Sequence, residues 1–154
     1  MRTFKFLDKE KREISTQLRA YCRKYHKEDY YLLRSIPGIG GIVACGILSE
    51  IGDLRLFNTI KQFAGYLCLA QGIYQSDDNS MGKVITKRAN KIMRSYFVDA
   101  SWQDIRADPD MQTYYRKHVH RNSKSIIIKI ARKLASRSLA VVKTGIPYEP
   151  GVVK

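Results

Sequence analysis

The stretch "SIPGIG", Ser35–Gly40, lies between two apolar segments that both have the residue spacing of helices. Pro37 fixes its own φ angle, whereas Gly38 and Gly40 allow positive φ values and a close approach of the backbone to a neighbour. A flexible linker would be longer and more polar, and it would not need two isoleucines. The stretch therefore predicts two helices that are joined by a short turn of defined shape.

The turn is also a candidate phosphate site. The helix predicted after it, Ile42–Ile51, begins just beyond Gly40 and ends before Gly52. The unpaired N–H groups and the positive dipole end of a helix N-terminus can bind a phosphate oxygen without any side chain. We therefore predict that Gly38, Ile39 and Gly40 contact a nucleic-acid backbone, as in a helix-hairpin-helix motif, without reading base sequence. The alternative interpretation is a tight connection between two helices that binds nothing.

Apolar residues recur at helical spacing along most of the chain, and no segment alternates like a strand. The predicted fold class is therefore all-α, a helical domain built around a helix-hairpin-helix. We expect residues 1–30 to form a long helix, a candidate part of a coiled coil, with a break near Glu28 and Asp29. Residues 31–148 form the domain and residues 149–154 a tail. Further helices are predicted from Asn58 or Thr59 to Leu69, from Ile85 to Ala107, from Asp108 onward, and from Ser123 or Ser125 onward.

The charge of the chain narrows the class of partner. Lys and Arg total 28 against 14 Asp and Glu, so the formal net charge is +14 over 154 residues. This excess favours a polyanionic partner, a nucleic acid or an anionic membrane surface, and disfavours a plain metabolic enzyme. No run of 18 apolar residues predicts a membrane-spanning helix. A membrane-surface protein is the weaker interpretation, because no segment combines a cationic face with an exposed Trp- or Phe-rich face.

The three cysteines, Cys22, Cys45 and Cys68, are widely spaced in apolar surroundings and form no CxxC pair. We therefore expect reduced thiols within the core of a cytoplasmic protein. The three histidines complete no ligand set with these cysteines, so no metal site is predicted.

Basic residues gather in two of the predicted helices. The first group is Lys83, Lys87, Arg88, Lys91 and Arg94, and the second group is Lys129, Arg132, Lys133 and Arg137. In the first group, Lys87, Lys91 and Arg94 have the spacing of one helical face, and the second group lies opposite the apolar stripe of the last helix. Few acidic residues interleave with them, which favours surfaces that follow a phosphate backbone. The alternative interpretation is two solvated helix faces.

The segment Gln71–Lys83 is polar, contains glycine and has no periodicity, which predicts an exposed loop. It contains Ser76 and Ser80, with Asp77 and Asp78 between them. Serine is common in polar loops, and no Ser-His-Asp signature is present. These residues by themselves therefore do not predict a catalytic serine.

The motifs "IPGIG", "EIGDLRLF", a serine-bearing loop and "ARKL" follow one another in a specific order. Over Leu32–Tyr148 the chain resembles the C-terminal domain of insertion-sequence transposases related to the pilin-gene invertase, some of which are guided by a bridge RNA. The resemblance implies a DNA recombinase whose RuvC-like N-terminal domain binds magnesium through four acidic residues. It also implies a coiled coil that joins that domain to this one, so we expect a homo-oligomer.

The resemblance further implies a serine nucleophile within the loop. Counting back from "ITKR", Ile85–Arg88, places it at Ser76, and slack in the loop alignment leaves Ser80 as the alternative. The serine Oγ would attack a DNA phosphodiester and form a phosphoserine link. Asp77 stands where the family has a glycine, and this is a departure from the pattern.

The predicted function is thus the DNA-binding and serine-nucleophile domain of a transposase or site-specific recombinase. We expect this chain to be a fragment that lacks the RuvC-like domain. The fragment should bind DNA, hold no cofactor of its own and be inactive alone. A guide RNA is a further partner that the resemblance allows. The alternative function is a non-enzymatic helix-hairpin-helix module that binds DNA or RNA.

Overall fold

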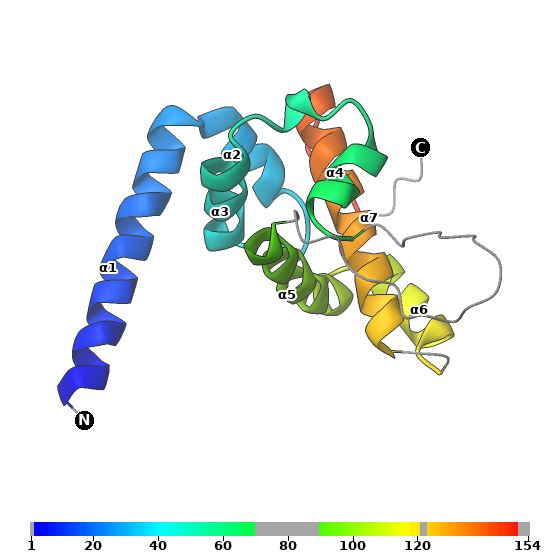
Figure 1. The fold of residues 1–154 in the computed structure, drawn as a ribbon, viewed down its shortest axis with the longest axis horizontal. Coiled ribbons are helices and arrows are strands. Elements are labelled where there is room, and N and C mark those ends of the chain that lie inside the picture. The colour runs from blue at the N-terminus through cyan, green and yellow to red at the C-terminus, as the bar shows by residue number, and fades with distance from the viewer. Residues whose placement is uncertain (1, 70–89, 121–122, 151–154) are drawn as a thin grey trace, which may run out of the picture.

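The computed structural model describes residues 2–69, 90–120 and 123–150, and these ranges are helical with no strand (Figure 1). The elements are α1 (Arg2–Tyr25), α2 (Lys27–Arg34), α3 (Gly41–Ile51), the 3-10 helix η1 (Leu54–Leu56), α4 (Ile60–Tyr66), α5 (Lys91–Ala107), α6 (Pro109–His118) and α7 (Ser123–Thr144). The all-α fold class is therefore confirmed. Within the described ranges, no helix has both the length and the apolar composition to cross a membrane.

The long helix α7 lies at the centre of the domain, where α2, α4, α5, α6 and η1 pack against it. Its isoleucines and leucines recur at helical spacing, and Ile130 and Leu134 are fully buried. Ser138 is also fully buried, and its hydroxyl donates to the carbonyl oxygen of Leu134 at 2.9 Å, which satisfies this polar group inside the core. The helix begins at Ser123, the first of the two predicted starts.

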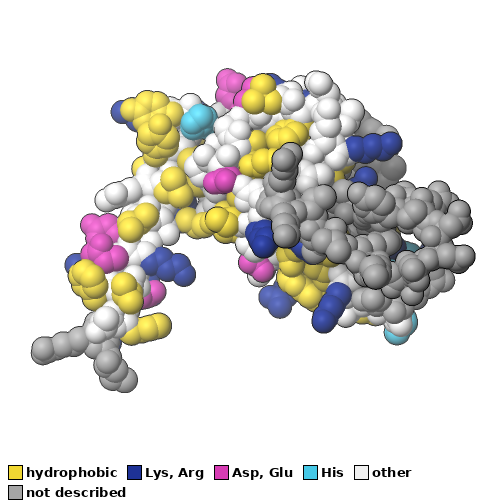
Figure 2. Space-filling view, viewed as in Figure 1, with side chains coloured by type: hydrophobic (Ala, Val, Ile, Leu, Met, Phe, Trp, Pro, Cys, Tyr) yellow, Lys and Arg dark blue, Asp and Glu magenta, His cyan; other side chains and the backbone are white. Residues whose placement is uncertain are grey.

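Helix α1 projects from the domain, and its C-terminal part packs on α2 and α3 (Figure 1). Cys22 is buried against the core, whereas Phe4 and Phe6 are exposed, and Figure 2 shows hydrophobic side chains along the projecting helix. The helix stops before His26, because the backbone of this residue (φ −130°, ψ 40°) leaves the helical region. The predicted break is therefore confirmed, but it lies at His26, two residues before the predicted position at Glu28.

Local geometry settles two predicted helix boundaries. Helix α3 ends at Ile51, where Gly52 has a φ of +73°, so the predicted stop is confirmed. Thr59 rather than Asn58 caps α4, because its hydroxyl accepts the N–H of Gln62. The side chain of Gln62 accepts the backbone N–H of Thr59 in return, which completes a capping box.

The start of α5 differs from the prediction. The apolar spacing predicts a helix from Ile85, but α5 begins at Lys91 because Asn90 is its N-cap. The side-chain oxygen of Asn90 accepts a backbone N–H of the first turn at 3.0 Å. Of the three cations predicted to share one helical face, Lys91 and Arg94 lie on α5, whereas Lys87 lies outside the described residues.

Asn90 also joins α5 to α3 and α4. Its amide nitrogen donates to the hydroxyl of Tyr66 at 3.1 Å and to the carboxylate of Glu50. Its backbone N–H donates to the carbonyl oxygen of Tyr66 at 3.0 Å. One residue thus caps a helix and fixes the position of that helix start.

We expect Asn90→Ala to lower the free energy of unfolding by about 1–2 kcal/mol, because it removes the N-cap of α5 together with two links between helices. Chemical denaturation followed by circular dichroism measures this effect. Asn58→Ala is the matched control, since Thr59 caps α4 and the Asn58 side chain makes no hydrogen bond within the described residues. An equal loss from both substitutions would contradict the role of Asn90.

Candidate nucleic-acid interface

The turn between α2 and α3 is anchored in the core by its own isoleucines. Ile36 and Ile39 are 1% and 3% exposed, and the N–H of Ile39 donates to the carbonyl oxygen of Ile36 at 3.1 Å. Gly38 has a φ of +86°, a backbone conformation that glycine adopts without steric cost. The predicted pair of helices with a short turn is confirmed, and phosphate binding by the turn stays a prediction.

The two glycines of the turn have different surroundings. A methyl group on Gly38 would lie 2.4 Å from the carbonyl oxygen of Ala100 and 2.8 Å from the backbone nitrogen of Asp104, so the turn packs directly on α5. A methyl group on Gly40 would meet no atom within 4 Å, and Gly40 is exposed. Of the three residues predicted to contact phosphate, Ile39 has a buried side chain, Gly38 packs on α5, and Gly40 faces solvent.

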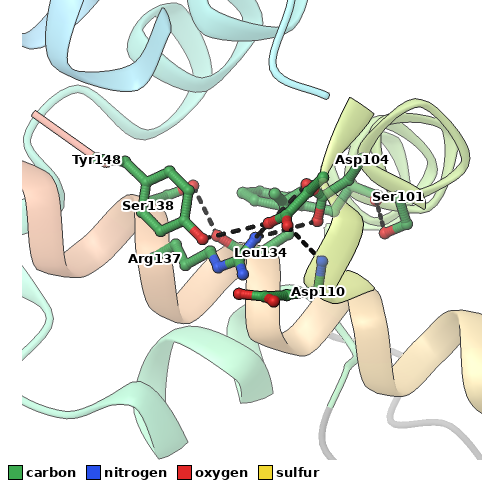
Figure 3. A network of polar contacts seen from close by, with 9 residues as sticks. Ser101, Asp104, Asp110, Leu134, Arg137, Ser138 and Tyr148 are labelled. Atoms are coloured by element: carbon green, nitrogen blue, oxygen red, sulfur yellow. Dashed lines mark hydrogen bonds and ion pairs between the residues drawn. The ribbon is translucent and has the colours of Figure 1, made fainter. Parts of the chain in front are cut away.

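A buried polar network connects α5, α6 and α7 (Figure 3). Asp104 of α5 and Asp108, the N-cap of α6, are 0% and 1% exposed. The Nη1 atom of Arg137 on α7 donates to Oδ2 of Asp108 at 2.8 Å and lies 3.4 Å from Oδ2 of Asp104. The sequence places Arg137 among the surface cations of the last helix. That prediction is wrong, because its side chain is 16% exposed and is paired with two carboxylates.

The C-terminal tail joins this network to the turn. The hydroxyl of Tyr148 donates to Oδ2 of Asp108 at 3.2 Å, and the guanidinium of Arg137 lies 4.5 Å from the centroid of the Tyr148 ring. The backbone N–H of Tyr148 donates to the hydroxyl oxygen of Ser35 at 2.8 Å, and that hydroxyl donates to the carbonyl of Leu32 at 2.6 Å. The turn is therefore held from two sides, by α5 and by the tail.

The network has one carboxyl group with a strongly altered acidity. Burial raises the pKa of Asp104 from 3.8 to about 7, since desolvation disfavours the carboxylate. The positive charge of Arg137 opposes this rise, and the negative charge of Asp108 adds to it. Between these two pKa values the folded chain holds a proton that the unfolded chain has lost. Stability should therefore fall as the pH rises from about 4 through about 7.

We expect wild type to lose roughly 2–3 kcal/mol of unfolding free energy between about pH 5 and about pH 8 through this group, and Asp104→Asn to lose much less. Denaturant titrations at several pH values measure the difference. Asp110→Asn, which removes an exposed carboxylate at the start of α6, should keep the pH dependence of wild type. Parallel pH profiles for wild type and Asp104→Asn would show that Asp104 is ionised in the fold.

The basic residues of α7 converge on one open pocket. Lys129, Arg132 and Lys133 line a cavity of about 360 Å³, and apolar side chains of α4 and α6 form its walls, with Ile60 and Tyr114 among them. The Nζ atom of Lys133 lies 4.6 Å from the centroid of the Tyr114 ring, a cation–π contact. Within the described residues none of the three cations is in an ion pair.

A second pocket continues this surface onto α5. Arg94 lines a cavity of about 290 Å³ with Trp102 and Lys124, and this cavity shares Ile128 with the first pocket. The predicted cations of α7 therefore adjoin Arg94 on one basic surface. Lys91 is exposed in the first turn of α5.

The remaining predicted site residues lie outside the described ranges; they are Ser76, Ser80, Lys83, Lys87 and Arg88. Among the residues that the structure does describe, no group of three or more His, Cys, Asp or Glu side chains is arranged to hold a metal ion.

Sequence reasoning missed the residues that position the turn, namely Ser35, Asp104 and Tyr148. Ser35 and Tyr148 are 113 positions apart, so no local pattern connects them. For Asp104 a signal exists: it follows Phe97 and Ala100 at helical spacing, so an acidic residue occupies the buried face of a helix.

A helical domain with a large positive charge and unpaired cations around open pockets is typical of proteins that bind nucleic acids. The chain belongs to the IS116/IS110/IS902 family of transposases, because the model of that family matches residues 30–116, more than half of the chain. The family resemblance of the sequence is thereby confirmed.

Three relatives show how this chain compares with longer proteins. The pilin gene-inverting protein of Moraxella bovis is 29% identical over 122 residues, which are 77% of this chain and 38% of the relative. An uncharacterized 43.6 kDa protein of insertion element IS110 from Streptomyces coelicolor is 27% identical over 120 residues, 77% of this chain and 30% of the relative. The transposase of insertion sequence element IS1111A from Coxiella burnetii is 27% identical over 71 residues, 46% of this chain and 20% of the relative. The chain thus matches well under half of the length of each.

Proposed function

We propose that this chain is the DNA-binding and serine-nucleophile domain of a transposase or site-specific recombinase. The observation that carries the DNA-binding part is the convergence of Lys129, Arg132 and Lys133 on one open pocket without carboxylate partners in the described residues. Unpaired cations on a rigid helix bind phosphates with little loss of entropy, and each neutralised phosphate releases counterions. Gly40 at the start of α3 provides a further backbone contact in this proposal.

We expect the triple variant Lys129→Gln, Arg132→Gln, Lys133→Gln to bind duplex DNA more weakly and to reduce the salt slope by up to about three. Fluorescence anisotropy with duplexes of unrelated sequence over a salt series measures both quantities. The matched control is Lys5→Gln, Lys9→Gln, Lys11→Gln, which removes the same charge from exposed positions of α1. If both variants lose the same affinity, net charge alone drives binding and the α7 surface is not the interface.

The catalytic part of the proposal places the nucleophile at Ser76, with Ser80 as the alternative. The serine Oγ attacks the phosphorus of a DNA phosphodiester, the P–Oγ bond forms, and the bond from phosphorus to the leaving sugar oxygen breaks. The leaving oxygen takes up a proton, and the phosphoserine link conserves the bond energy for the joining step. A serine hydroxyl needs help to lose its proton, and we propose that magnesium in a RuvC-like domain of the whole protein supplies it.

We expect a whole protein with its RuvC-like domain to form a covalent adduct with a suicide DNA substrate, and Ser76→Ala to abolish this adduct without weakening DNA binding. Peptide mapping of the trapped adduct identifies the residue. An adduct on Ser80 would select the alternative nucleophile. Intact binding with no adduct would favour the non-enzymatic helix-hairpin-helix module.

Self-association through α1 completes the proposal. Phe4, Phe6 and Ile14 are 78%, 61% and 61% exposed on the projecting helix, an apolar area that a coiled-coil partner would cover. A guide RNA is a second partner in this proposal, and its binding is measured by the same anisotropy assay with an RNA probe.

A further inference from the structure

The N-terminus of α3 has backbone donors that make no hydrogen bond within the described residues. Its N-cap, Gly40, has no side chain, and the first helical hydrogen bond runs from the N–H of Ala44 to the carbonyl of Gly40 at 2.9 Å. The N–H groups of Gly41, Ile42 and Val43 therefore have no partner within the helix. The aligned peptide dipoles of this 11-residue helix add about half a positive charge at the same end.

Two arginines from other helices lie against this end of α3. A methyl group on Gly41 would lie 3.3 Å from Nη1 of Arg34, the last residue of α2, and 3.1 Å from Cδ of Arg19 on α1. In the described part of the chain, the arginines that form ion pairs are Arg12, Arg55 and Arg137. Arg19 and Arg34 therefore have no carboxylate partner there. Like charges beside a positive dipole end repel one another unless an anion lies among them.

The hydroxyl of Tyr30 points to the same place. Tyr30 is 3% exposed, and its hydroxyl oxygen would lie 2.9 Å from the methyl group on Gly41. Within the described residues this hydroxyl makes no hydrogen bond, whereas every fully buried side-chain nitrogen or oxygen has a partner. The hydroxyl therefore reaches the surface at this point, as a donor held by a buried ring.

We propose that Tyr30, Arg34 and the first-turn N–H groups of α3, together the α3 phosphate niche, hold one phosphate of a DNA backbone. Arg19 adds positive charge from α1. The proposal rests on the proposed function for its choice of DNA as the ligand. A phosphodiester has two charged oxygens, which accept from a guanidinium, a hydroxyl and backbone N–H groups at once. The niche extends the interface from the turn, where the sequence places it, to the side chains of α2 and α1.

Two substitutions separate the parts of the niche. Tyr30→Phe keeps the buried ring and removes only the hydroxyl, so duplex binding should weaken on the order of tenfold with an unchanged salt slope. Arg34→Gln should weaken binding and reduce the slope by about one. The fold-loss of duplex affinity in the double variant should be smaller than the product of the fold-losses in the two single variants, because both groups contact the same phosphate. Arg106→Gln, at an exposed position of α5, is the control for net charge. Fluorescence anisotropy of the full chain with a labelled duplex measures all four variants.

The position of Gly40 provides a test with an opposite effect on stability. Its backbone is extended (φ −73°, ψ 170°) and a side chain there meets no atom within 4 Å. Gly40→Asp should therefore cap α3 and raise the melting temperature while it weakens DNA binding, because its carboxylate replaces the phosphate. Gly40→Asn caps the helix without charge and should weaken binding less.

Inorganic phosphate is the probe that does not depend on the proposed function. Titration of the ¹⁵N-labelled chain should shift the amide resonances of Gly41 and Ile42, and Tyr30→Phe should reduce the shifts. If these amides do not respond, the niche is overturned even where DNA binds.

The DNA titrations distinguish failure of the niche from failure of the proposed function. Wild-type affinity in both Tyr30→Phe and Arg34→Gln, with weak binding by the triple α7 variant, overturns the niche and leaves the proposed function standing. Absence of duplex binding by wild type overturns the proposed function and the DNA assignment of the niche. If Tyr30→Phe and Arg34→Gln weaken binding to an RNA probe and leave binding to duplex DNA unchanged, the DNA assignment of the niche is overturned as well.

Discussion

One arginine paired with two buried carboxylates joins three helices and the C-terminal tail of this domain. Asp104, Asp108 and Arg137 come from the end of α5, the start of α6 and the middle of α7, and Tyr148 adds the tail. Two buried carboxylates against one guanidinium leave an excess negative charge, which is costly in the interior. A proton on Asp104 removes that excess, in agreement with a pKa raised to about 7. Loss of any one partner leaves the others desolvated and incompletely paired.

The position of the α2–α3 turn depends on this network. Gly38 contacts the backbone of α5 at Ala100 and Asp104, and Ser35 accepts the N–H of Tyr148, so both ends of the turn are fixed by residues in or beside the network. The start of α3 is therefore presented by a packed scaffold and not by a free loop. Helix α7 contributes residues to both the network and the basic surface, because Arg137 points into the network and Lys133 lines the open pocket.

The sequence predicts those features that local chemistry determines. Gly52 ends α3 because glycine can adopt a positive φ angle. Thr59 starts α4 because its hydroxyl accepts the backbone N–H of Gln62 three residues later. Periodicity fails where a polar side chain caps a helix start later than the apolar spacing indicates, as Asn90 does for α5, because apolar spacing continues on both sides of a cap. It also fails for Arg137, since a pattern of cations does not show which one meets a buried carboxylate.

The same limit applies to the candidate site. A regular helix places side chains three and four residues apart close together, so the sequence could group the three cations of α7, but the pocket that they line depends on α4 and α6 and was not predicted. Tyr30 was not predictable, because a tyrosine on an apolar face is usually core, and only its position beside Gly41 shows what its hydroxyl faces. The assignment of Ser76 rests on resemblance alone, since the loop lies outside the described residues.

The attachment of α1 has a geometric consequence for whatever binds its far half. This helix has 24 residues, so it is about 36 Å long, and it is held by its last turns, where Cys22 is buried against the core. An α-helix turns by about 100° per residue, so one residue inserted between Ile14 and Cys22 rotates the exposed Phe4, Phe6 and Ile14 around the helix axis while the domain stays unchanged. The anchor at Cys22 therefore fixes the rotation of α1 about its own axis, and with it the direction in which the exposed apolar side chains of its far half point.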